Sequence, residues 1–248
     1  YAHLGVKHAF ISPGSRNTPL MLALMDQNKI KVHNIIDERS SGYMALGLAK
    51  TNHIPALVIT TSGTAVSNLF PSIVEGYMSS IPMIILTADR PKKMIGTGAN
   101  QTINQHNIFK DYTRDFIDFS IFKKNDQKLI VKTILDSYKK SIGVSKTSGG
   151  PIHINIPFDL SLYIDNRENV VLDNDIFSGI SALNNKIENK IQLPDLSASL
   201  KPLIVCTDYK DLGIISLAEK YNIPLIMECR GLRFTKKSKN IVSHYEFL

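Results

Sequence analysis

The chain has 248 residues, of which 43% are hydrophobic, enough to bury one large core or two modest ones. It contains no apolar run near the roughly 20 residues of a membrane helix and no signal-like N-terminus, so we expect a soluble, cytoplasmic protein. Cys206 and Cys229 are its only cysteines, which predicts neither a disulfide framework nor a metal site in this chain. The net charge of +7 comes from scattered lysines, a pattern typical of a solvated surface and not of nucleic-acid binding.

Short apolar runs along the first part of the chain have the length and low polarity of strands buried on both faces. These runs are His8 to Ile11, Val32 to Ile36, Ala56 to Thr60, Met83 to Thr87 and Ile152 to Ile156. Segments with apolar residues at helical spacing alternate with them: Pro19 to Met25, Ser41 to Lys50, Ala65 to Tyr77 and Lys128 to Ile142. The alternation predicts an α/β fold, with a mainly parallel open sheet flanked by helices.

The composition divides the chain into three parts. Residues 1–163 carry this alternation, residues 164–199 are polar and typical of a linker, and residues 200–248 begin a second α/β domain. That second domain, with Leu203 to Cys206, a helix near Leu212 to Tyr221 and Leu225 to Met227, is too short to bury a core by itself. Because the sequence opens on Tyr1 and stops soon after this domain begins, we expect a fragment of a longer protein.

In an open parallel sheet, ligands bind at the carboxyl ends of the strands, so the loops that follow the strands are the candidates for function. The first of these loops contains Gly14, which permits a tight turn, and Arg16, which could bind an anion together with free backbone N–H groups. The fourth contains Arg90, which could equally form a surface ion pair with Asp89.

The second and third loops each allow a structural and a functional interpretation. Asp37 and Glu38 lie between a strand and a helix, where a carboxylate can be poised for proton transfer or can stabilise the first helical turn, and Asp37 fits the structural role better. Residues 61–64 form a hydroxyl-rich turn that could bind a ligand or cap its helix. Residues 96–101 contain two glycines of a dinucleotide fingerprint but lack the third, so a nicotinamide-dependent enzyme ranks last.

Taken in order, the loops resemble the N-terminal domain of the 2-succinyl-5-enolpyruvyl-6-hydroxy-3-cyclohexene-1-carboxylate (SEPHCHC) synthases, a family of thiamine diphosphate enzymes. Each segment is weak evidence alone, but the ordered set is specific. The likeness runs from the first residues to about Tyr163. The segments are residues 12–16 (SPGSR), 37–40 (DERS), 45–50 (ALGLAK), 61–65 (TSGTA), 86–91 (LTADRP), 98–101 (GANQ) and 150–157 (GPIHINIP).

The resemblance implies a transferase that decarboxylates 2-oxoglutarate on thiamine diphosphate and adds the succinyl unit to isochorismate, in menaquinone or phylloquinone biosynthesis. It implies that Glu38 is the catalytic glutamate, which hydrogen-bonds the aminopyrimidine ring of the cofactor. The cofactor-binding residues implied are Glu38, Ser62, Gly63 and Thr64. The substrate-binding residues implied are Ser15, Arg16, Arg90, Asn100 and Gln101, where arginines would offset the carboxylates of both substrates.

The resemblance also implies what the chain lacks. The GDG segment and the asparagine that hold Mg²⁺ and the diphosphate in this family do not occur here, so the metal ligands are expected in a missing C-terminal domain. The fragment alone should therefore be catalytically incomplete. Because the family's site lies between two subunits, a homodimer or dimer of dimers is implied, with no nucleic-acid or membrane partner.

Two alternatives stay open from the sequence. Another thiamine diphosphate enzyme, such as an acetolactate synthase or a 2-oxo acid decarboxylase, would share the fold and the glutamate, but the loops of residues 12–16 and 88–91 argue against it. The second alternative is a non-catalytic α/β module, which would use the arginines to bind an anionic metabolite but would catalyse no reaction. Cofactor dependence in the complete protein distinguishes the two classes.

Overall fold

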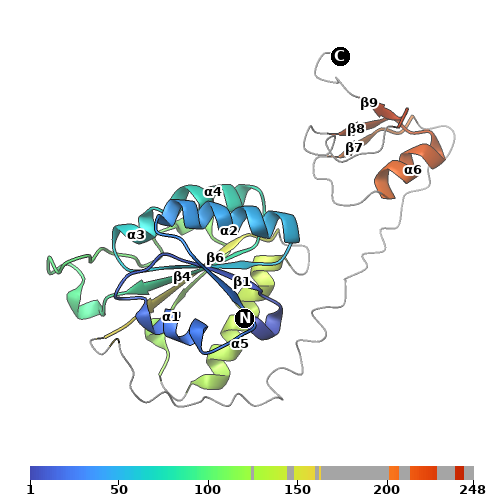
Figure 1. The fold of residues 1–248 in the computed structure, drawn as a ribbon. Coiled ribbons are helices and arrows are strands. Elements are labelled where there is room, and N and C mark those ends of the chain that lie inside the picture. The colour runs from blue at the N-terminus through green and yellow to red at the C-terminus, as the bar shows by residue number, and fades with distance from the viewer. Residues whose placement is uncertain are drawn as a thin grey trace. The chain divides into compact units, whose positions relative to one another are not determined.

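The computed structural model describes residues 1–123, 126–143, 148–159, 162, 201–206, 213–227 and 238–242. The chain divides into two compact units, residues 1–185 and 186–248, each with its own sheet (Figure 1). The linker predicted at residues 164–199 lies outside the described residues, so the boundaries at 163 and 199 remain a prediction.

A parallel sheet forms the centre of the first unit. Its strands run in the order β2-β1-β3-β4-β6-β5, and every neighbouring pair is parallel. The strands are β1 (His8–Ile11), β2 (Lys31–Asn34), β3 (Ala56–Thr60), β4 (Met83–Asp89), β5 (Asp115–Asp118) and β6 (Pro151–Pro157). The predicted α/β class is confirmed, and the continuous apolar runs of β3 and β4 are explained by their complete burial.

Helices cover both faces of this sheet. The α-helices described in this unit are α1 (Thr18–Met25), α2 (Glu38–Asn52), α3 (Thr64–Ser67), α4 (Phe70–Met78) and α5 (Gln127–Ile142). Figure 1 shows α2 and α4 on one face and α1 and α5 on the other. Side chains alternate accordingly along β3, where Leu57 and Ile59 join the core under α1 and α5 while Val58 joins the core under α2 and α4.

One predicted helix, residues 65–77, is in fact two helices. The first ends at Ser67 and the second begins at Phe70, with Pro71 in its first turn. A proline has no N–H to donate, and its ring clashes with the carbonyl four residues earlier, which ends a helix at this point. Four short 3₁₀ segments complete the described first unit: Ala2–Leu4, Lys92–Met94, Lys110–Tyr112 and Phe119–Ile121.

The second unit begins with a parallel sheet of the same kind. It contains β7 (Ile204–Cys206), α6 (Gly213–Tyr221), β8 (Leu225–Met227) and β9 (Ile241–Val242), with strand order β7-β8-β9. Ile215 and Ala218 of α6 pack on Leu225 and Met227 of β8 in a small core. The predicted strand-helix-strand opening is confirmed, and β9 was not predicted. None of the described helices is both long and apolar enough to cross a membrane.

Candidate functional site

The predicted loops meet at one edge of the first sheet. Arg16 follows β1, Glu38 follows β2, Ser62 follows β3 and Arg90 follows β4. Because these strands are parallel neighbours in the order β2-β1-β3-β4, their carboxyl ends point the same way and bring the loops together. The arrangement places a carboxylate, a hydroxyl-rich turn and two guanidinium groups along this edge.

Asp37 and Glu38 have different roles at the start of α2. Asp37 is the N-cap, and its carboxylate accepts a hydrogen bond from the Ser40 N–H at 2.7 Å, which lowers the pKa of Asp37. Glu38 is the first helical residue, and its Oε2 accepts a hydrogen bond from the Asn68 amide at 3.1 Å. The capping role therefore belongs to Asp37, and the Glu38 carboxylate is left available at a partly exposed strand end.

The turn after β3 is held against the loop that contains Gln101. The Ser62 hydroxyl donates to the Gln101 carbonyl at 3.1 Å, and the Gln101 side-chain amide donates back to the Ser62 carbonyl at 3.1 Å. Between them, Gly63 has a φ of 83°, and a Cβ there would approach Cγ of Gln101 to 2.9 Å. Glycine is thus required by both the backbone conformation and the close contact. Thr64 is exposed as the first residue of α3.

Gln105 is a buried residue of this site that the sequence did not reveal. Its Oε1 accepts a hydrogen bond from the Gly63 N–H at 2.8 Å, while its Nε2 donates to the Ala88 carbonyl at 3.1 Å and to Asn155 Oδ1 at 3.0 Å. One side chain therefore joins the turn after β3 to the ends of β4 and β6. A glutamine in an irregular segment gives no signal of such contacts in the sequence alone.

Arg16 is buried and ties the loop after β1 to the end of β6. Its Nη1 donates to the carbonyls of Phe158 at 2.9 Å and Asp159 at 3.2 Å, while neighbouring Ser15 is exposed. Burial and the charge of nearby Arg90 lower the pKa of Arg16, although a guanidinium stays protonated near neutral pH. Its Nε is buried without a hydrogen-bond partner in the described residues.

The suggested surface ion pair between Arg90 and Asp89 is wrong. Arg90 is only 8% exposed, and its guanidinium Nη2 donates to the carbonyl of Asn100 at 3.2 Å. Asn100 itself is exposed. Asp89 Oδ1 instead accepts the backbone N–H of Arg90 at 2.7 Å. Each arginine is thus held by a hydrogen bond to a backbone carbonyl. Arg16 donates to the carbonyl of Phe158, and Arg90 donates to the carbonyl of Asn100.

A chain of buried polar side chains lies beneath Arg90. Asp89 Oδ2 accepts from the Asn155 amide at 2.7 Å, and Asn155 Oδ1 accepts from the Thr87 hydroxyl at 2.8 Å. Thr87 Oγ1 also lies 2.8 Å from Nε2 of His153, and since its one proton goes to Asn155, we assign the donor proton to His153 Nε2. Burial raises the pKa of Asp89, and the hydrogen bonds from Asn155 and the Arg90 N–H oppose this shift.

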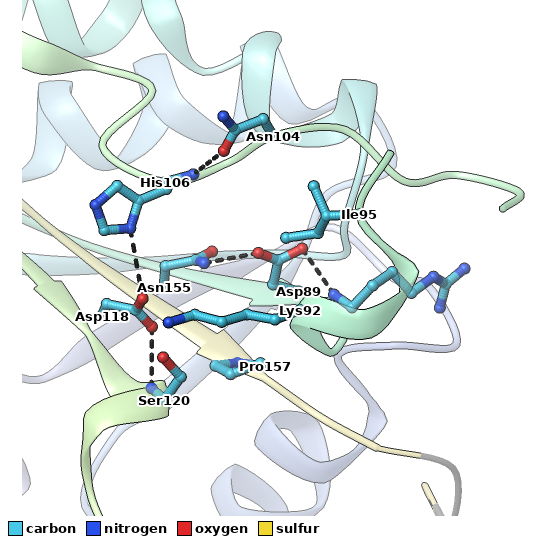
Figure 2. Close-up of a pocket in the computed structure, with 10 residues that line it drawn as sticks. Asp89, Lys92, Ile95, Asn104, His106, Asp118, Ser120, Asn155 and Pro157 are labelled. Carbon is cyan, nitrogen blue, oxygen red and sulfur yellow. Dashed lines mark hydrogen bonds and ion pairs between the residues drawn. The ribbon is translucent and has the colours of Figure 1, made fainter. Parts of the chain in front are cut away.

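A pocket of about 420 Å³ opens beside Arg90, at the carboxyl ends of β4, β5 and β6 (Figure 2). Arg90 is the one predicted site residue among those that line it. Its lining consists of Asp89, Arg90, Lys92, Ile95, Asn104, His106, Asp118, Ser120, Asn155 and Pro157. The sequence did not predict this pocket, because one wall follows β5, a strand that it did not predict.

Comparison with known proteins shows what the first unit is similar to. Residues 2–108 match the family described as thiamine pyrophosphate enzyme, N-terminal TPP binding domain. This segment therefore resembles the N-terminal domain of the thiamine pyrophosphate enzymes. The resemblance predicted from the loops is confirmed at this level, and thiamine diphosphate (the same compound as thiamine pyrophosphate) is the cofactor of the family. The matched range contains Arg16, Glu38, Ser62 and Arg90.

Several relatives of this chain are named 2-succinyl-5-enolpyruvyl-6-hydroxy-3-cyclohexene-1-carboxylate synthase. The Shewanella loihica protein is 43% identical over 162 residues, covering 65% of this chain and 27% of that protein. The Bacillus velezensis protein is 34% identical over 255 residues, covering 98% of this chain and 43% of that protein. The Listeria innocua protein is 42% identical over 153 residues, covering 62% of this chain and 26% of that protein. The chain thus spans less than half the length of these relatives.

Proposed function

We propose that this chain is part of a SEPHCHC synthase, which decarboxylates 2-oxoglutarate and adds the succinyl unit to isochorismate in menaquinone biosynthesis. The names of the relatives and the ordered loops support this assignment. The observation that carries it is the placement of Glu38. Its carboxylate stands at the carboxyl end of β2, Asp37 performs the helix capping, and one of its two oxygens makes no hydrogen bond within the described residues.

The residues present fit the pyrimidine side of thiamine diphosphate. When bound, this cofactor supplies the electron sink that decarboxylation of a 2-oxo acid requires. Glu38 would hold a proton against a ring nitrogen, with Asn68 orienting the carboxylate through its 3.1 Å hydrogen bond. The turn formed by Ser62, Gly63 and Thr64 would contact the same group, since its backbone is fixed by Gly63's conformation and its link to Gln101.

The two arginines are suited to bind anionic substrates. Both arginine residues are more than nine-tenths buried, and each has a buried Nε without a partner in the described residues. A buried unpaired donor is costly, and a carboxylate is the acceptor that a guanidinium fork fits best. We assign Arg16 and Arg90 to the carboxylates of the substrates, with Ser15, Asn100 and Gln101 as the polar groups beside them.

Exposed apolar side chains beside Glu38 support a subunit interface there. Ile36 is 86% exposed, and Tyr43 and Met44 on α2 are 44% and 48% exposed. Exposed apolar surface is a common mark of a protein–protein interface. We propose that a second subunit covers them in a cytoplasmic homodimer or dimer of dimers, and that its other domains supply the Mg²⁺ ligands and the diphosphate site.

Glu38→Gln in the complete protein tests the assignment. The substitution keeps the size of the side chain and an oxygen for Asn68 but removes the charge, so turnover should fall at least ~100-fold while the melting temperature stays close to the parent value. Glu75→Gln is the matched control, because Glu75 is an exposed glutamate on α4, outside the site, and should leave turnover unchanged. Full activity in Glu38→Gln would remove Glu38 from its role.

A further inference from the structure

Two parts of the candidate site follow different strands and must be aligned with each other. The turn after β3 is assigned to the cofactor, and Arg90, which follows β4, is assigned to a substrate carboxylate. In a decarboxylation on a cofactor the two ligands have to meet, so the spacing between the turn and Arg90 matters for the reaction. Both lie in loops, which are the more mobile parts of a fold, so this spacing has to be held by other contacts.

A continuous chain of hydrogen bonds between buried side chains joins the N–H of Gly63 to the N–H of Arg90. At one end, Gln105 Oε1 accepts the Gly63 N–H at 2.8 Å. Gln105 Nε2 donates to Asn155 Oδ1 at 3.0 Å, and Asn155 Nδ2 donates to Asp89 Oδ2 at 2.7 Å, a bond that Figure 2 shows. At the other end, Asp89 Oδ1 accepts the Arg90 N–H at 2.7 Å. The turn and Arg90 are therefore connected through side chains alone.

The polarity of this chain fixes the orientation of each side chain in it. Gln105 must turn its oxygen toward the Gly63 N–H, so its nitrogen faces Asn155. Asn155 must then turn its oxygen toward Gln105 and its nitrogen toward Asp89. Asp89 has to accept from both of its neighbours, which a carboxylate does with its two oxygens and an amide cannot do. All three side chains are buried, so bulk water is a poor substitute for any of these bonds.

Resting on the proposed function, we infer that Asp89 and Asn155 are positioning residues, which hold Arg90 at the distance from the turn after β3 that the reaction requires. The cofactor would lie against the turn and a substrate carboxylate against Arg90, so the hydrogen-bonded chain aligns the 2-oxo acid with the cofactor. Both residues act through Arg90 and through Gln105. A misalignment of ~1 Å in such a site can cost ~100-fold in rate.

Asp89 could instead act through its charge alone, and the two roles predict opposite effects. Its carboxylate is close enough to Arg90 and Arg16 to interact with the charges of both. Removing the negative charge would leave the two guanidinium groups less neutralised and would strengthen the binding of an anionic substrate. Removing the ability to accept two hydrogen bonds would displace Arg90 and slow the reaction.

Steady-state turnover of the complete protein with Asp89→Asn separates these effects. The substitution keeps the size of the side chain, but its amide nitrogen must face either the Arg90 N–H or the Asn155 amide, donor against donor. We expect kcat/KM for 2-oxoglutarate to fall at least about tenfold, with a loss in kcat. The dissociation constant of thiamine diphosphate should stay within about twofold of the parent value, because Gln105 still holds the turn.

The double variant Asp89→Asn/Asn155→Asp exchanges donor and acceptor in the middle of the chain. The new carboxylate accepts from Gln105 and from the new amide, whose oxygen accepts the Arg90 N–H, so every bond of the chain is restored at unchanged net charge. Its kcat/KM should recover to within about threefold of the parent value. Hydrogen exchange at the Arg90 amide should be faster in Asp89→Asn and slow again in the double variant.

Thr87→Val is the matched control. The Thr87 hydroxyl also donates to Asn155 Oδ1, at 2.8 Å, but it lies off the path from Gly63 to Arg90. Its loss should lower the melting temperature and leave kcat/KM at the parent value. A residue that only stabilises the fold would show no such separation between stability and turnover.

The proposal is overturned if Asp89→Asn keeps or raises kcat/KM, if the double variant stays as slow as Asp89→Asn, or if Thr87→Val slows turnover as much as Asp89→Asn does. Should Asp89→Asn fail to fold, the double variant decides: turnover like the parent's supports the positioning role, and slow turnover or failure to fold overturns it. The parent is assayed beside every variant. An inactive parent contradicts the proposed function, whereas an active parent with an unaffected Asp89→Asn variant contradicts the positioning role alone.

Discussion

His153 should make the first unit begin to lose stability at a higher pH than the titration of carboxylates alone would cause. The side chain is completely buried on β6, with its ring centroid 4.8 Å from that of Phe109 and 5.2 Å from that of Phe116. Burial, and to a smaller extent the charge of His106, lowers the pKa of His153 to about 3. The neutral ring donates from Nε2 to Thr87, and its Nδ1 has no partner in the described residues.

The size of the effect follows from the difference between the folded and unfolded states. The unfolded side chain titrates at 6.5 and the folded one at about 3, so the unfolded state binds a proton more tightly throughout this interval. Stability from the neutral His153 is therefore fully present above pH 6.5 and is lost as the pH falls toward 3. At ~1.4 kcal/mol per pH unit, the total loss is about 5 kcal/mol, of which about 2 kcal/mol is lost by pH 5.

Urea unfolding of the chain between pH 7 and pH 4.5 measures this loss. His153→Gln keeps an amide that can donate to Thr87, but this amide cannot take up a proton. Between pH 7 and pH 5 the free energy of unfolding should therefore fall by about 2 kcal/mol less in this variant than in the parent. His53→Asn is the control, because His53 is exposed at the end of α2 with a φ of 54°, which asparagine tolerates. Equal pH dependence of the parent and His153→Gln would show that His153 does not cause this loss of stability.

Two further substitutions test how the site is assembled. Gly63→Ala should cost about 2 kcal/mol in urea unfolding, because alanine is strained at a φ of 83° and its Cβ would displace Gln101, and an unchanged stability would contradict the described turn. Gln105→Leu leaves the Gly63 N–H and the Ala88 carbonyl without their partner and should cost about 3 kcal/mol, with faster hydrogen exchange at the Gly63 amide. Slow exchange in that variant would show that Gln105 does not hold the turn.

The central strands could be predicted from the sequence because their burial is continuous. The runs at His8–Ile11 and Ala56–Thr60 were predicted with the limits that the structure shows. The edge strand Asp115–Asp118 was not predicted, because it is short and both its ends are acidic, so neither an apolar run nor helical spacing marks it. The helix break before Phe70 could have been predicted, since Pro71 is a local signal that overrides the apolar spacing.

The loops of the candidate site could be placed at one edge of the sheet because parallel strands bring their carboxyl ends together. Contacts between distant residues could not be predicted in this way. Arg16 reaches the Phe158 carbonyl 142 positions along the chain, and Gln105 reaches Gly63 across 42 positions. Asp118 and the pocket that it helps to form were missed together with β5, since a functional residue cannot be placed on a strand that has not been predicted.

Turnover by the complete protein that contains this chain would test the proposed function most directly. Isochorismate consumption would be followed in the presence of 2-oxoglutarate, thiamine diphosphate and Mg²⁺, with each component omitted in turn. We predict that isochorismate is consumed only when both the oxo acid and the cofactor are present. Decarboxylation of 2-oxoglutarate without loss of isochorismate would contradict the synthase assignment, and turnover that does not depend on thiamine diphosphate would contradict the role given to Glu38.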